Sequence, residues 1–150
     1  MEIQSLKLLV SEDELNELVR QHQHEMGAVE KLRLRLTPEG VIVQGEYPTF
    51  LMKMAFETLW ELGVNGPEVQ ARLAAVRVAG LPAGMLKGAL LKMIADVAGK
   101  EPGVRLQDDV VSVHLEEAAR ARGLFLRVCL NAVRCSVGCL VVEAGPSVGS

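Results

Sequence analysis

Residues 81 to 99, LPAGMLKGALLKMIADVAG, limit the possible folds of this chain more than any other segment. Only Lys87, Lys92 and Asp96 carry charge in this segment, and the pattern predicts a helix over residues 84 to 98. A helix that is apolar around most of its circumference cannot lie on a surface with one face in water. We therefore expect the other elements to enclose this helix, or to leave room beside it for an apolar molecule.

The length of 150 residues predicts a single domain spanning residues 1 to 150, with a loose tail over residues 145 to 150. Hydrophobic residues make up 49% of the chain but aromatic residues only 3%, so we expect a core of Leu, Val, Ala and Met. The net charge of -3 offers no positive field to a phosphate backbone, so nucleic acid is not expected as a partner.

The expected location is the cytoplasm. The N-terminus lacks the basic and apolar regions of a signal peptide, and no run reaches the roughly 18 apolar residues that span a bilayer. The three cysteines are Cys129, Cys135 and Cys139, and an odd number in one short region is typical of reduced thiols rather than of a disulfide framework. The sequence leaves open whether these thiols have a redox role.

Local signals predict a helix followed by a hairpin in the first third of the chain. Ser11 and Glu14 form a capping box, so a helix should begin there and end near Gly27. From residue 31 to residue 47, apolar and polar residues alternate on either side of a turn at residues 37 to 40, which is typical of a half-buried hairpin.

Residues 51 to 64 satisfy both helical and strand spacing, and the turn that follows decides between them. Asn65-Gly66 is typical of a tight hairpin turn whose two central residues have positive φ, so we expect strands on either side. In the second strand, residues 69 to 78, the apolar positions change parity, which predicts a bulge near Ala74 and Ala75.

Beyond the apolar helix we expect a strand over residues 110 to 113, a short helix over 116 to 121 and a final hairpin over 124 to 144. Together these elements predict an α+β fold. In this fold a strongly twisted, mostly antiparallel sheet wraps one long apolar helix, and two shorter helices close the ends.

Two polar clusters are candidates for chemistry. His22, His24 and Glu25 are metal-ligand types, but two histidines at i and i+2 leave opposite sides of a helix, so we interpret them as a helix end. Asp108 and Asp109 could share a proton, yet neighbours on a strand point apart and Asp is common in turns.

The cysteines form a third cluster. Cys135 and Cys139 could lie across a hairpin, close enough for a disulfide or, with Cys129, for a thiolate cluster, and packing of small residues is the alternative. A nucleophilic cysteine would need a histidine such as His114. The sequence contains no catalytic signature, so we expect no enzyme activity, no metal and no cofactor.

The turn from Gly80 to Gly84 leads into the apolar helix. Exposed N–H groups there could hold an anion, with Lys87 one turn further on. We therefore predict Gly84 and Lys87 as a head-group or anion site, with a simple turn as the alternative.

Methionine and aromatic side chains could line a pocket for an acyl chain, because thioethers adapt to flexible apolar ligands. The predicted ligand-binding residues are Met52, Met54, Phe56, Trp60, Met85, Leu86, Leu90, Met93 and Ile94. The alternative is that these side chains fill an ordinary core.

Four segments, SEDELNELV, PEGVIVQG, VNGPEV and VRVAGLPAG, occur in this order before or at the apolar helix. In this order they resemble the tubular lipid-binding superfamily, and in particular its small bacterial single-domain members, which are related to the bactericidal permeability-increasing protein. The resemblance implies a highly curved antiparallel sheet around a long helix, matched here by residues 81 to 98, and a tube that takes lipid tails without catalysis.

We therefore expect non-enzymatic binding of a lipid or other apolar ligand in a groove between the long helix and the curved sheet. The alternative is a protein–protein interaction or self-association module with a packed core, no ligand and a possible homo-oligomer.

Overall fold

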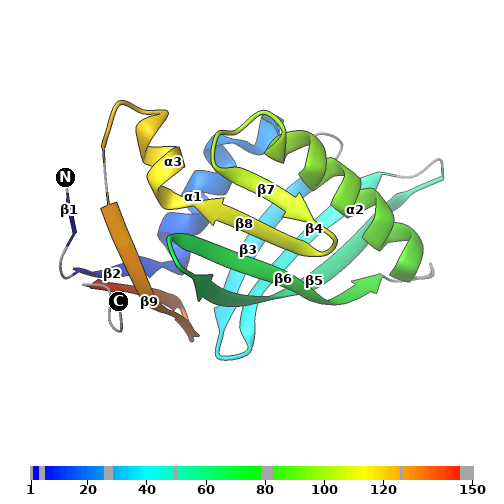
Figure 1. Cartoon of the computed structure of the whole chain (residues 1–150). Coiled ribbons are helices and arrows are strands. Elements are labelled where there is room, and N and C mark those ends of the chain that lie inside the picture. The colour runs from blue at the N-terminus through cyan, green and yellow to red at the C-terminus, as the bar shows by residue number, and fades with distance from the viewer. Residues whose placement is uncertain are drawn as a thin grey trace.

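The computed structural model describes residues 2–3, 6–25, 29–48, 51–78, 83–125 and 127–145. Within these residues the chain forms two β-sheets and three α-helices, shown in Figure 1. The helices are α1 (Glu12–Gln21), α2 (Ala83–Ala98) and α3 (Leu115–Arg120), and a 3-10 turn, η1, covers Gln23–Glu25.

The larger sheet is antiparallel throughout and has the strand order β3-β4-β5-β6-β8-β7. Its strands are β3 (Glu30–Thr37), β4 (Gly40–Pro48), β5 (Lys53–Asn65), β6 (Glu68–Val78), β7 (Val104–Gln107) and β8 (Val110–His114). In Figure 1, β7 and β8 lie in front of β3 and β4, so this sheet is strongly twisted rather than flat.

The smaller sheet has the order β1-β9-β10-β2 and lies beyond the end of the larger sheet where β5 joins β6 (Figure 1). Its strands are β1 (Glu2–Ile3), β2 (Leu6–Ser11), β9 (Arg127–Ser136) and β10 (Cys139–Gly145). Only β1 pairs in parallel. The predicted α+β class with mostly antiparallel sheets is therefore confirmed.

The capping box is confirmed at the start of α1. The Ser11 hydroxyl accepts a hydrogen bond from the Glu14 N–H at 3.1 Å, which satisfies one of the unpaired N–H groups of the first turn. Acidic side chains in this turn also interact favourably with the positive end of the helix dipole.

The turn between β5 and β6 differs from the prediction by one residue. Asn65 pairs with Glu68, so the central residues are Gly66 and Pro67, and only Gly66 has a positive φ, of 59°. Proline fixes its own φ near -65°, which excludes a turn with positive φ at both positions and favours glycine at the first. The predicted bulge is confirmed, because Leu59 pairs with Ala75 and Trp60 with Leu73, which leaves Ala74 unpaired.

Two described residues of α2 are buried, Leu90 and Ala98, and Leu90, which is 4% exposed, contacts Phe56 of β5 and Val29. Small or charged residues form an exposed face of the helix. This face comprises Gly84, Gly88, Lys92, Ala95 and Asp96. The structure therefore does not show α2 enclosed on most sides. The exposed face is tolerated because its small and charged side chains leave little apolar area in contact with water.

A second core cluster connects the two sheets. Leu130 of β9 and Ala144 of β10 are buried, and Val64 and Val69 of the larger sheet pack against them together with Leu115. Strands β5 and β9 also touch. The predicted tail over residues 145 to 150 lies outside the described residues except for Gly145, which ends β10.

Gly40 sets the distance between β4 and β5 beside Trp60. Its φ of 147° is a conformation that L side chains rarely adopt, and a Cβ atom there would collide with the Trp60 carbonyl oxygen. We expect Gly40→Ala to lower the free energy of unfolding by at least about 2 kcal/mol, measured by urea titration. Gly63→Ala is the matched control, because its Cβ meets no described atom within 4 Å, and a change above about 0.5 kcal/mol is not expected there. Equal effects of the two substitutions would contradict this packing.

Candidate functional site

A cavity of about 190 Å³ lies between α1, α2 and the inner face of strands β3, β4 and β5. Almost all of its wall is apolar. The lining residues are Val19, Leu32, Leu34, Val43, Phe56, Thr58, Trp60, Leu90, Met93 and Ile94. The structure thus brings together five of the predicted ligand-binding residues, namely Phe56, Trp60, Leu90, Met93 and Ile94.

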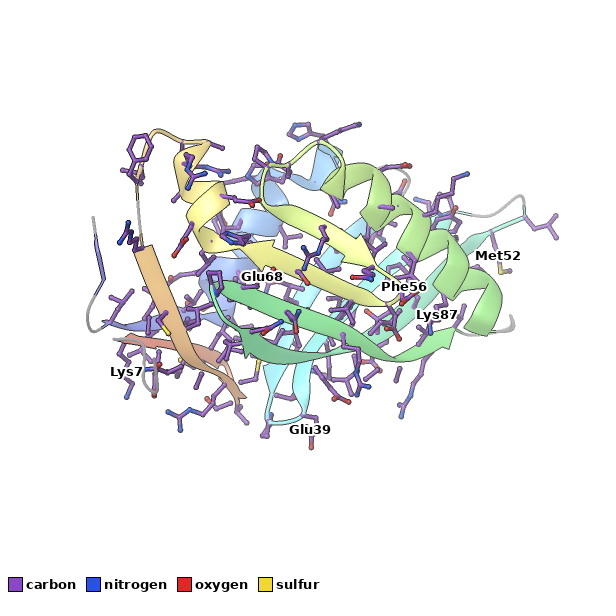
Figure 2. All side chains as sticks on the ribbon, viewed as in Figure 1. Lys7, Glu39, Met52, Phe56, Glu68 and Lys87 are labelled. Atoms are coloured by element: carbon purple, nitrogen blue, oxygen red, sulfur yellow. The ribbon has the colours of Figure 1, made fainter. Side chains whose placement is uncertain are left out.

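The other predicted ligand-binding residues have different positions. Met54 is buried in β5 but is not part of this wall, and Met52 is exposed just before β5, at the far right of Figure 2. Met85 and Leu86 lie on α2, and their side chains are outside the described part of the structure.

Sequence reasoning missed the part of the wall that comes from α1, β3 and β4. Leu32 and Leu34 are apolar positions of the alternating segment from residue 31 to residue 47, and Thr58 has the same strand parity as Phe56 and Trp60. These patterns place residues on an inner face, but the contact with α2 depends on the tertiary fold.

The polar groups in the wall bind each other. Thr58 is buried, its hydroxyl donates to the Val43 carbonyl oxygen at 3.2 Å, and the same hydroxyl oxygen accepts from the Trp60 indole N–H at 2.9 Å. In the described structure no buried side-chain nitrogen or oxygen lacks a hydrogen-bond partner. The cavity therefore offers no unsatisfied polar side chain to an occupant, so an apolar occupant fits it best.

The predicted anion residues lie at a different hollow. Gly84 and Lys87 line a space of about 170 Å³ with residues 73 to 76 of β6, and this hollow shares no lining residue with the apolar cavity. The Lys87 ammonium lies 3.9 Å from a carboxylate oxygen of Asp109, and both side chains are partly exposed, so this ion pair is weak. The anion site stays a prediction, and the structure does not bring it together with the apolar residues.

A larger hollow, of about 630 Å³, is open and lies over charged residues of the larger sheet. Arg33, Gln44, Glu57 and Arg77 form a row across four strands on the outer face. The Glu57 carboxylate at the centre accepts from Gln44 at 2.9 Å and lies 3.5 Å from Arg35. Because charges of both signs alternate along this face, we interpret it as a solvated surface.

Cys129, Cys135 and Cys139 are free thiols in this structure, and all three are half-buried. Cys139 pairs with Ser136 and Cys135 with Leu140, so the two thiols are not on directly opposed residues. Burial raises the pKa of the Cys135 thiol, which disfavours the thiolate needed for nucleophilic or metal chemistry.

The other polar candidates lie in a turn, at helix ends or in η1. Asp108 and Asp109 form the turn between β7 and β8, where Asp108 has a positive φ of 56°. His114 caps α3, because its Nδ1 accepts from the Glu117 N–H at 3.2 Å. His22 is the C-terminal cap of α1, and His24 lies in η1.

Two properties concern the described residues as a whole. No three of their His, Cys, Asp or Glu side chains gather as metal ligands would. None of the described helices has both the length and the apolar character that crossing a bilayer requires.

No protein-family model, curated protein or solved structure matches this chain. The resemblance to the tubular lipid-binding superfamily therefore stays a prediction.

We expect Thr58→Val to remove the acceptor of the Trp60 indole N–H and to lower the free energy of unfolding by about 1 to 3 kcal/mol. In NMR spectra the indole proton should exchange faster with solvent. Thr58→Ser keeps the hydroxyl and should keep the protection. An indole proton equally protected in the valine variant would contradict this hydrogen-bond chain.

We expect alkylation of Cys135 by iodoacetamide to reach its half-maximal rate at a higher pH in the folded chain than in urea. The reason is that burial raises the thiol pKa, and only the thiolate reacts. Peptide mass spectrometry gives the rate at each pH. Restricted access lowers the rate equally at every pH, so the midpoint reports the pKa alone, and an unchanged midpoint would contradict the burial effect.

Proposed function

We propose that this protein binds a small apolar molecule, or the end of a lipid acyl chain, in the cavity between α2 and the larger sheet, and that it catalyses no reaction. The observation that carries the proposal is the cavity wall, in which apolar side chains surround polar groups that bind only each other. Such a wall favours an occupant that needs no hydrogen bonds.

The cavity volume sets the size of the occupant. A cavity of about 150 Å³ holds a benzene molecule, so 190 Å³ corresponds to roughly six or seven carbon atoms. At about 0.8 kcal/mol for each buried methylene group, six carbons contribute about 5 kcal/mol before the costs of binding. A ligand held only by this cavity would bind with a Kd near the millimolar range, and a longer chain would need further contacts.

In this proposal the sheet curves around the inner face of α2, as the resemblance to the small bacterial members of the tubular lipid-binding superfamily implies. A head group would lie outside the cavity, and Lys87 contributes little to its binding because it lines a separate hollow. The three free thiols favour a location in the cytoplasm.

Trp60 makes the proposal testable, because it is the only tryptophan of the chain and it lines the cavity. Bromine quenches tryptophan fluorescence at short range. We expect 6-bromohexanoate, which dissolves at millimolar concentrations and keeps its carboxylate outside the cavity, to quench Trp60 with saturation, and hexanoate to compete with it.

Two substitutions on α2 distinguish binding in the cavity from binding elsewhere. Ile94→Phe places a larger side chain in the cavity wall, whereas Ala95→Phe places the same side chain on the exposed face. We expect the first variant to lose saturable quenching and the second to retain it. Linear quenching without saturation in the native chain, or equal binding by both variants, would contradict the proposed site.

A further inference from the structure

The two sheets have edges that differ in how they are covered. At the β3 edge of the larger sheet, side chains from α1 and η1 bind the free backbone of β3 in place of a neighbouring strand. The Leu36 N–H donates to Glu12 at 2.7 Å, and the Leu34 N–H donates to Asn16 at 2.7 Å. The Leu32 N–H donates to Gln23 at 3.2 Å. This edge is therefore closed to another strand.

The β2 edge of the smaller sheet lacks such a cover in the described structure. Strand β2 pairs only with β10, and no described side chain donates to or accepts from its outer backbone. Leu6, Leu8 and Leu9 are 43%, 49% and 60% exposed. An exposed apolar edge strand is a site for pairing with a further strand.

We propose that β2 pairs with β2 of a second copy of this chain, antiparallel and centred on Leu8, so that two four-stranded sheets join into one. An unpaired strand edge requires an extended strand as its occupant, because only a strand provides N–H and C=O groups at matching intervals. The strand β2 itself meets this requirement, and an antiparallel pair of identical strands has two-fold symmetry.

The side-chain pattern of β2 fits this register. Residues of one parity, Leu6, Leu8 and Val10, are all apolar and share the face on which Val142 packs into the core. With Leu8 opposite Leu8 of the second copy, each Leu6 lies opposite a Val10, and the apolar face continues across the symmetry axis.

The charge on the other face of β2 is compatible with the same register. Lys7 is the only charged residue of the strand, and a lysine on an edge can prevent pairing. The residue opposite Lys7 within its own sheet is Glu143 of β10, whose carboxylate forms an ion pair with Arg134 of β9, so the compatibility of Lys7 with pairing depends on the register alone. In the proposed register Lys7 faces Leu9 of the second copy rather than another lysine. In Figure 2, Lys7 lies at the lower left of the molecule, away from α2.

The small area predicts a weak dimer. One pair of six-residue strands buries less than the roughly 1,200 Å² of a stable interface, so the dimer should dissociate on dilution. The strand shares no residue with the apolar cavity, so this inference does not depend on ligand binding.

Sedimentation velocity from about 1 µM to about 1 mM tests the proposal. We expect the native chain to change from monomer to dimer within this range, and Leu8→Lys to stay monomeric with an unchanged circular dichroism spectrum. Leu18→Lys is the matched control, because Leu18 is 52% exposed on α1 and receives the same charge, and this variant should dimerise like the native chain. A native chain that is monomeric throughout, or assemblies larger than dimers, would overturn the proposal.

A cross-link tests the register. Directly opposed residues of an antiparallel pair have Cα atoms about 4.5 to 5.5 Å apart, within the range that a disulfide bridges. In a chain with Cys129, Cys135 and Cys139 changed to Ser, we expect Leu8→Cys to give a covalent dimer on oxidation and Leu18→Cys to give none. Equal cross-linking at both positions would refute pairing centred on Leu8.

Discussion

The contact between Leu90 of α2 and Phe56 of β5 holds the helix against the sheet beside the candidate cavity. It is the only described contact in which α2 contributes a nearly fully buried side chain to the central core cluster, and it places the helix over the inner face of the larger sheet. Met93 and Ile94, on the next turn of the helix, then form one wall of the apolar cavity, opposite Trp60. Without this contact the cavity lacks the wall that α2 provides, and the apolar side of α2 is exposed to water.

The polar side chains of α1 have a double role. By binding the free backbone of β3 they prevent pairing of a further strand at the β3 edge of the larger sheet, and they also hold α1 where Val19 completes the cavity wall. Among the described residues nothing comparable covers the outer edge of β2, and its leucines are exposed. The protein thus has a covered sheet edge at β3, beside the cavity, and an uncovered sheet edge at β2, away from the cavity.

Features set by neighbouring residues could be predicted from the sequence, and features set by distant contacts could not. The start of α1 at Ser11 follows from a local hydrogen bond, and the bulge at Ala74 follows from a change of parity. Strand β2 was missed because its apolar run lacks alternation and forms a strand only through pairing with β10. Lys92 and the small residues of α2 explain why a mostly apolar helix tolerates an exposed face.

We propose that the space beside Leu90 takes an apolar guest. Xenon enters apolar cavities of this size and is visible in diffraction because it is rich in electrons. A crystal structure of the native chain under xenon pressure should show a xenon atom between Phe56, Trp60 and Met93. A space filled by repacked side chains or by ordered water, with no xenon bound there, would contradict the account.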